Sequence, residues 1–323
     1  MKTLRKLLAS LCSIVLYLNL SGTTCYAAKN LFFYREPKAM CMMALVLSHP
    51  EDENDIIIPC SINSKQLKQI KKVFNNVYIF HRKDKAEQLK KFSEVKDQYD
   101  RIFIHHTNYP YYKDFYLNKK THKFEDGSTM YVQENLPNRE NIEKTYSLFP
   151  AYRHNSWGNT PNMPIAREKY LKGIKLLFNP STLKGKIFYC FDGPELFNYA
   201  QEEKIVNILK NYDDVVVKFH PRHHDHPIKL VPKKFTVLDD QRRPFESYYY
   251  GFNGIFISNL STCLHTAKFM KPDAPVICTA CLDGTTVEQR WIPYIEMLKK
   301  LGVMFPKTLA ELKSMISQNI SKI

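Results

Sequence analysis

Short runs of branched and aromatic apolar residues alternate with amphipathic helical segments along most of this 323-residue chain. Uninterrupted β-branched strands that alternate with helices are typical of a parallel sheet covered on both faces. The sequence predicts one such series before residue 135 and a second after residue 185, joined by a loop-rich segment at 135–162. We therefore expect an α/β protein with two Rossmann-like lobes whose strands end at a shared cleft.

The expected elements can be stated as ranges. Strands are predicted at 31–34, 55–59, 76–80, 101–105, 186–191, 215–219, 235–238, 254–258 and 275–278, with a strand–turn–strand at 123–132. Helices are predicted at 37–47, 64–74 (opened by a capping Ser64), 83–92, 201–211, 245–250, 261–270 and 308–321. The predicted division is residues 1–28 as a leader, 29–165 as an acceptor-side domain and 166–323 as a nucleotide-sugar-binding domain.

The first 28 residues have the layout of a secretory signal. A basic start with Lys2, Arg5 and Lys6 precedes an apolar run at 7–20 and a small, polar segment at 21–28. The apolar run is short for a membrane span, which needs about 20 residues. We predict a signal peptide or signal-anchor, which would export the protein or attach it to a membrane. If the segment is an anchor or an over-extended start, the cytoplasmic face of the membrane is expected.

The chain carries a formal net charge of +15, and removing the three basic residues of the leader leaves +12 (15 − 3). This balance favours anionic partners such as nucleotides, phosphorylated glycolipids or a membrane surface. The lysines are scattered over helix faces without an aromatic–basic recognition motif, so nucleic-acid binding is not expected.

An acidic turn, Glu125-Asp126-Gly127, provides the first candidate catalytic group. Glycine permits a sharp turn, and a neighbouring carboxylate raises the pKa of an aspartate, so Asp126 could accept a proton from a sugar hydroxyl. An ordinary β-turn has the same composition. Asp192, in Phe191-Asp192-Gly193 at the end of another predicted strand, is a rival for the same role.

A histidine follows a valine-rich strand in His220-Pro221-Arg222. Pro221 biases His220 toward extended geometry, and a histidine held there can donate to a departing phosphate. Basic side chains beside it, Lys218 and Arg222, would stabilise the same charge. The run from His220 to His226 could instead bind a transition metal.

Two further strings complete the set. Ser261-Thr262 precedes a predicted helix, and hydroxyls with free N–H groups at a helix N-terminus can hold a phosphate or simply cap the helix. Glu246, in Pro244-Phe245-Glu246, would lie in the first turn of a short helix, where it could contact ribose hydroxyls or only favour the helix dipole. By contrast, Cys278-Thr-Ala-Cys281 lacks a second cysteine pair and indicates core packing rather than a zinc or redox site.

The order EDGSTMY, KFHPR, RPFES, SNLST resembles the bacterial sialyltransferases of glycosyltransferase family 52, the lipooligosaccharide group, over about residues 29–281. The resemblance implies two Rossmann lobes, metal-independent chemistry and CMP-sialic acid as donor. It also implies that Asp126 is the general base and that His220 assists departure of CMP. By the same resemblance Ser261 and Thr262 hold the CMP phosphate, and Glu246 lies near the ribose.

These observations predict a sialyltransferase-like glycosyltransferase that uses a nucleotide-sugar donor, no metal or other cofactor, and an anionic glycan or glycolipid acceptor. The acceptor sugar would be a terminal sugar, with galactose expected, and peripheral membrane contact would follow from the acceptor. Because the family also contains glucosyltransferases, a different nucleotide-sugar donor is one alternative. A non-catalytic anion- or metal-binding protein is the other.

Overall fold

The computed structural model describes residues 27–34, 38–58, 62–79, 90, 93–105, 121–125, 127–132, 141–180, 182–193, 196–222, 227–238 and 243–323. Most of the expected leader, most of the helix expected at 83–92, the residue Asp126 and the histidines of 223–226 lie outside the described residues. Within the described ranges, no helix combines the length and the hydropathy needed to cross a membrane.

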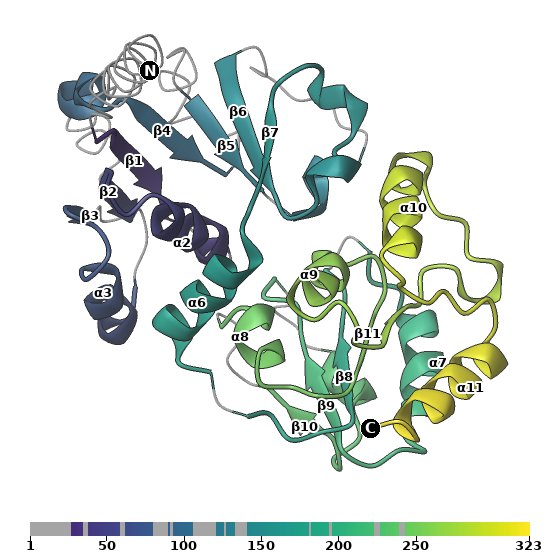
Figure 1. Cartoon of the computed structure of the whole chain (residues 1–323). Coiled ribbons are helices and arrows are strands. Elements are labelled where there is room, and N and C mark those ends of the chain that lie inside the picture. Colours follow the sequence, from purple (N-terminus) through teal and green to yellow (C-terminus); the bar gives the residue numbers. More distant parts are fainter. Residues whose placement is uncertain are drawn as a thin grey trace, which may run out of the picture.

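The N-terminal lobe is built on a seven-stranded parallel sheet in the order β3-β2-β1-β4-β5-β6-β7 (Figure 1). Ile56, Ile57 and Ile58 form the buried end of its second strand, as their β-branching favours. The strands are β1 (Lys29–Phe33), β2 (Glu53–Ile58), β3 (Val77–Ile79), β4 (Arg101–Ile104), β5 (Thr121–Phe124), β6 (Ile142–Ser147) and β7 (Asn162–Pro164).

The C-terminal lobe contains a five-stranded parallel sheet in the order β10-β9-β8-β11-β12. Its three central strands are completely buried and apolar over almost their whole length, which suits a sheet covered on both faces. The strands are β8 (Ile187–Cys190), β9 (Val215–Lys218), β10 (Thr236–Val237), β11 (Ile255–Ser258) and β12 (Val276–Cys278).

Helices cover both faces of the C-terminal sheet. Alternate residues of each strand point to opposite sides, so Phe188 and Phe256 pack in one apolar cluster while Ile187 and Ile255 pack in another. The helices are α2 (Ala39–Ser48), α3 (Ser64–Ile70), α6 (Arg167–Phe178), α7 (Tyr199–Leu209), α8 (Phe245–Tyr249), α9 (Thr262–Met270), α10 (Ile292–Lys300) and α11 (Leu309–Ile320).

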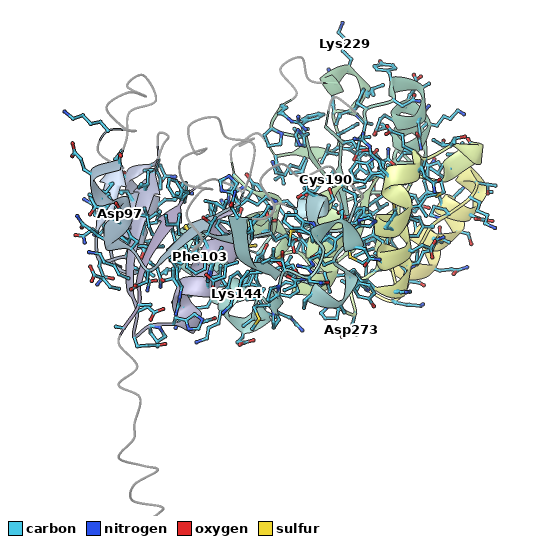
Figure 2. All side chains as sticks on the ribbon, turned by 90° about the horizontal axis from the view of Figure 1, so that it is seen from above. Asp97, Phe103, Lys144, Cys190, Lys229 and Asp273 are labelled. Atoms are coloured by element: carbon cyan, nitrogen blue, oxygen red, sulfur yellow. The ribbon has the colours of Figure 1, made fainter. Side chains whose placement is uncertain are left out.

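The two lobes share one continuous apolar core. The cluster that contains Phe188 and Phe256 also contains Phe32 of β1 and the buried residues of α2. Helix α6 lies between the lobes, where it packs mainly on α2 and also touches α8 and α9 (Figure 1). Figure 2, which views the molecule from above, shows Phe103 in the first lobe and Cys190 in the second, with side chains filling the space between the ribbons. Because apolar surface runs across the junction, it stabilises the lobes against each other.

Three expectations about local structure were wrong. The strand–turn–strand expected at 123–132 has only its first strand, because residues Gly127–Met130 form a 3-10 helix instead. The segment 135–162 was expected to be a loop, yet it supplies β6, and β7 begins at its end. The capping residue of α3 is Asn63, whose side chain accepts the N–H of Gln66, rather than Ser64. Helices α6 and α10 were not predicted.

Candidate functional site

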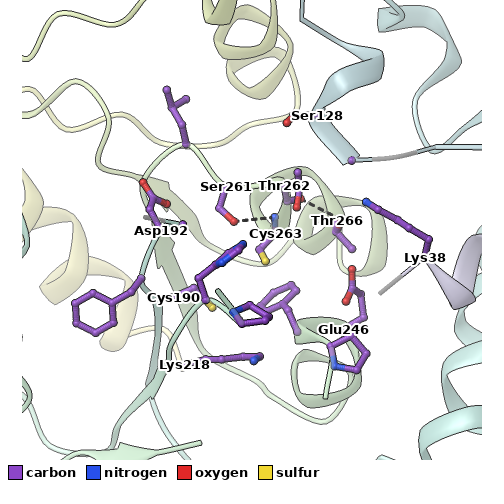
Figure 3. A pocket seen from close by; sticks show the side chains of 18 of the residues that line it. Lys38, Ser128, Cys190, Asp192, Lys218, Glu246, Ser261, Thr262, Cys263 and Thr266 are labelled. Carbon is purple, nitrogen blue, oxygen red and sulfur yellow. Dashed lines mark hydrogen bonds between the residues drawn. The ribbon is translucent and has the colours of Figure 1, made fainter. Parts of the chain in front are cut away.

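A cavity of about 600 Å³ opens where the carboxyl ends of the C-terminal strands meet the N-terminal lobe (Figure 3). A volume of this size suits a small organic ligand. Six of the seven predicted site residues line it, from three separate segments of the chain: Lys218, His220, Arg222, Glu246, Ser261 and Thr262. The seventh, Asp126, lies outside the described residues, but both of its chain neighbours line the same cavity.

The N-terminus of α9 forms one wall of the cavity. Ser261 is the N-cap, with extended backbone geometry, and its Oγ accepts the N–H of Cys263 at 3.2 Å. Thr262 is the first helical residue. The capping expected from the sequence is therefore present, and both hydroxyl residues of this turn line the cavity, where an anion could bind them.

Basic groups approach from the end of β9. Lys218 is buried as the last residue of the strand, with its ammonium 5.9 Å from the centre of the Tyr248 ring. His220 follows, and its Nδ1 accepts the backbone N–H of Arg222 at 3.2 Å, which fixes the ring at the start of the loop. That bond leaves Nε2 as the ring nitrogen able to act as a donor, because Nδ1 serves as the acceptor.

Glu246 reaches the cavity from the first turn of α8. Burial raises the pKa of this carboxyl, although the nearby ammonium groups of Lys38 and Lys218 and the hydroxyl of Tyr170 act in the opposite direction. Figure 3 shows Lys38 entering from the N-terminal lobe on the same side of the cavity as Glu246. Cations from both lobes thus surround one carboxyl group at the cavity wall.

The acidic turn of the N-terminal lobe is held by its first residue. Glu125 is buried, and its Oε2 accepts hydrogen bonds from Tyr131 Oη at 2.5 Å and from the Leu148 N–H at 2.7 Å. Its Oε1 lies 2.8 Å from Nε2 of His265, a residue of α9 in the other lobe. Burial alone would raise the pKa of Glu125, but these hydrogen bonds and the imidazole charge outweigh burial and lower it.

A chain of hydrogen bonds continues from this pair to the helix N-terminus. Nδ1 of His265 lies 2.8 Å from the hydroxyl of Tyr294, and that hydroxyl donates to the carbonyl of Ser261 at 2.9 Å. The acidic turn and the capping residue of α9 are therefore connected through two buried side chains.

Gly127, the third residue of the turn, makes a second contact with α9. Its backbone has φ +74°, and a Cβ placed there would lie 2.6 Å from Cγ2 of Thr262 and 3.0 Å from Nζ of Lys38. Glycine is required here for both the backbone conformation and the close approach. Glu125 and Gly127, the two chain neighbours of Asp126, are thus both held against α9.

The rival carboxyl, Asp192, also lines the cavity, two residues after the end of β8. Burial raises the pKa of Asp192 to about 7, although the Asn259 side chain and the Leu260 N–H donate to it and act in the opposite direction. A carboxyl with a pKa in this range can exchange a proton near neutral pH.

Sequence reasoning missed several residues of this site. Lys38 and Arg243 line the cavity, and His265 anchors the acidic turn. The position of His265 one turn into the helix that follows Ser261-Thr262 was a signal for it, but its partner lies 140 positions away in the sequence. Among the described residues, no group of three or more His, Cys, Asp or Glu side chains could hold a metal ion.

Comparison of the sequence with protein-family models and with curated proteins gives no match. Solved structures do match. The glycosyltransferase of kitacinnamycin is 9% identical, with 91% of each chain covered and a TM-score of 0.50. A UDP-glucosyltransferase from Polygonum tinctorium is 8% identical, with 92% of this chain and 90% of that chain covered and a TM-score of 0.50. A sialyltransferase from Photobacterium damsela is 14% identical, with 87% and 82% covered and a TM-score of 0.46.

The class that these likenesses define is the GT-B fold of glycosyltransferases, two Rossmann-like lobes that face a cleft. The fold class predicted from the sequence is confirmed. At these identities the likeness concerns the fold alone, and any chemistry depends on the residues of the cavity.

Proposed function

We propose that this chain is a metal-independent glycosyltransferase that transfers sialic acid from CMP-sialic acid to a terminal sugar, galactose in our expectation, of a glycolipid or lipooligosaccharide-type acceptor. One observation supports it above the others. Six residues chosen from the sequence for this chemistry line a single cavity in a GT-B fold, and the acidic turn borders the same cavity.

The donor would bind with its phosphate at the N-terminus of α9. Ser261 and Thr262 supply hydroxyls there, and Lys218 and Arg222 supply positive charge. Glu246 would accept hydrogen bonds from the ribose hydroxyls. Each pre-organised donor aimed at developing charge contributes about 3–4 kcal/mol to transition-state stabilisation.

His220 would assist the departure of CMP. When the glycosidic bond breaks, negative charge develops on the phosphate oxygen, and a donor hydrogen bond or a proton from Nε2 of His220 stabilises it. The bond between Nδ1 and the Arg222 N–H holds the imidazole in this orientation. The sialyl cation would then be attacked by the acceptor hydroxyl.

Asp126 would remove the proton of that hydroxyl as general base. Support comes from its neighbours, since Glu125 and Gly127 fix the turn beside the helix N-terminus. Asp192 is the second candidate for this role, because it lines the cavity with a pKa raised to about 7 by burial. The variants Asp126→Asn and Asp192→Asn distinguish the two candidates. Only the substitution that removes the general base should slow the chemical step.

The direct test is transfer from CMP-sialic acid to a panel of terminal-galactose glycans, with products weighed by mass spectrometry. We expect Asp126→Asn and His220→Ala each to lower the transfer rate by about 10²–10⁴-fold. His49→Ala, an exposed histidine outside the cavity, is the matched control and should leave the rate unchanged. Wild-type rates in both cavity variants would contradict the assignment.

Nucleotide selectivity tests the donor. A CMP-specific enzyme should show a higher melting temperature with CMP but not with UDP or CDP at the same concentration. A response to UDP or CDP instead would favour a transferase with another nucleotide-sugar donor. A stoichiometric bound metal in the purified protein would favour the non-catalytic alternative through the histidines of 220–226.

Charge and sequence motivate the remaining part of the proposal. The net charge of +15 would draw an anionic acceptor to the surface and support peripheral membrane contact. The leader would export the protein or attach it to a membrane.

A further inference from the structure

Two free thiols from different elements meet at the wall of the cavity. Cys190 is the last residue of β8, Cys263 lies in the first turn of α9, and both line the cavity. The thiol of Cys263 is close enough to contribute to the raised pKa of the Cys190 thiol. Figure 3 shows the two side chains next to each other beneath Ser261 and Thr262.

The sheet explains this proximity. Cys190 is paired in register with Ser258 of β11, whose Oγ donates to the carbonyl of Cys190 at 3.0 Å. Helix α9 begins four residues after β11 ends, and the N-cap bond between Ser261 Oγ and the Cys263 N–H fixes its start. Two neighbouring strand ends and a capped helix therefore bring both cysteines to the same wall of the cavity.

The two thiols differ in accessibility. Cys190 is buried, with 5% of its surface exposed, and burial together with the neighbouring thiol raises its pKa well above the ordinary value. Cys263 is half-buried and reaches the cavity. An oxidant that enters the cavity would consequently meet Cys263 first.

We propose that Cys190 and Cys263 are a thiol-modification site that closes to a reversible disulfide when a peroxide enters the cavity. The sulfur of Cys263 attacks one peroxide oxygen, which gives a sulfenic acid and releases one water. The sulfur of Cys190 then attacks the sulfenic sulfur, and the hydroxyl leaves as a second water. In total, two thiols and one hydrogen peroxide give one disulfide and two waters.

The disulfide would act on the helix N-terminus. It would join the end of β8 to the first turn of α9, and disulfide geometry requires Cα atoms about 4.4–6.8 Å apart. Ser261 and Thr262, which directly precede Cys263 in the sequence, would be displaced with it. Under the proposed function this lowers affinity for the donor phosphate, and a bound nucleotide should in turn shield Cys263. The disulfide itself does not depend on that function.

The test is peptide mapping of the intact protein after exposure to hydrogen peroxide. We expect one peptide pair that joins residues 190 and 263, two hydrogens lighter than the reduced pair, which separates again on treatment with dithiothreitol. Cys263→Ser should abolish this pair. Cys281→Ser, a half-buried cysteine outside the cavity, is the matched control and should leave it intact.

A second measurement separates the site from the proposed function. CMP at ten times its Kd should slow alkylation of Cys263 by iodoacetamide about tenfold. If the disulfide forms but CMP gives no protection, the nucleotide assignment fails and the thiol site stands. A pair that joins Cys263 to Cys41, which also lines the cavity, or oxidation to sulfinic acid without any cross-link, would overturn the proposal.

Discussion

Glu125 and His265 belong to different lobes, yet their side chains meet 2.8 Å apart with 3% and 0% of their surface exposed. The hydroxyl of Tyr294 donates its single hydrogen to the Ser261 carbonyl, so Nδ1 of His265 donates to that hydroxyl. Nε2 lies against the carboxylate of Glu125, whose pKa the imidazole contact lowers. The contact is a buried, charge-assisted hydrogen bond that joins the two lobes.

Removal of one member of this pair should cost much more stability than an exposed pair would. We expect His265→Ala to lower the free energy of unfolding by about 3–5 kcal/mol, because Glu125 would stay buried without its partner. The control is His49→Ala, which removes the exposed His49–Glu51 pair and should change stability by less than about 1 kcal/mol. Urea unfolding of both variants measures the difference, and equal effects would mean that the pair is not buried in solution.

The same pair should make stability depend on acid pH. The folded-state pKa of Glu125 is lowered, so its contribution is present above the unfolded-state value and is lost as pH falls through the folded-state value. Glu125→Gln should flatten this part of the stability curve below about pH 4.3. Chemical unfolding across acid pH, with Glu51→Gln as the exposed control, checks the sign. A steeper loss in Glu125→Gln than in the wild type would contradict it.

Gly127 offers a matched comparison with another glycine. Gly127 and Gly284 both have φ +74°, but a Cβ at Gly284 would meet nothing within 4 Å. Gly284→Ala should cost about 1–2 kcal/mol for the left-handed backbone alone. Gly127→Ala should cost about 1–3 kcal/mol more, because its methyl group would press on Thr262. Thr262→Ser, which removes the Cγ2 atom, should recover stability in the Gly127→Ala background only.

Ser261 combines a capping role with a proposed ligand role, and these can be separated. Ser261→Ala and Thr308→Ala each remove an N-cap side chain, from α9 and α11 respectively, and each should cost about 1 kcal/mol of stability. Only Ser261→Ala should also weaken CMP binding, since Thr308 lies away from the cavity. Calorimetric titration measures the affinity, and an equal loss in both variants would point to a general effect of destabilisation.

Asp192 should make stability fall as pH rises toward neutrality. Its folded-state pKa is raised to about 7, so the folded protein binds a proton that the unfolded chain releases above its ordinary value. Asp192→Asn should therefore stabilise the protein by about 3 kcal/mol more at about pH 8 than at about pH 5. Asp213→Asn, whose side chain is 91% exposed, should show no such change. Paired unfolding experiments at the two pH values decide this.

The sequence predicted the strands that are buried on both faces, because runs such as Val215, Val216 and Val217 carry their own signal. It did not predict β6 and β7, which are held by polar contacts. Thr145 Oγ1 donates to Asn162 Oδ1, and Arg153 donates to the carbonyls of Thr160 and Gly158. Strands that depend on such bonds show no apolar periodicity, so single-sequence reasoning assigns them to loops.

The candidate site likewise contains residues whose positions the sequence predicts and residues whose positions it does not. Ser261 and His220 lie within three residues of a strand end, and a parallel sheet brings strand ends together, so their convergence was predictable. The turn at Glu125 was predicted as part of a hairpin because its anchor, His265, lies in the other lobe. Lys38 was missed for a related reason, since nothing in its local sequence indicates that it lines this cavity.

The joined lobes have a consequence for how such a protein can change over evolutionary time. Two-lobed folds invite the exchange of whole halves, in which one lobe is joined to a different partner lobe. Here the apolar cluster crosses the junction, and the acidic turn is tied to α9 by a salt link and a glycine contact. A different N-terminal lobe without an acid and a glycine at these positions would leave the shared core incomplete and His265 buried without its partner. The acid and the glycine therefore determine which N-terminal lobes can pack on this C-terminal lobe.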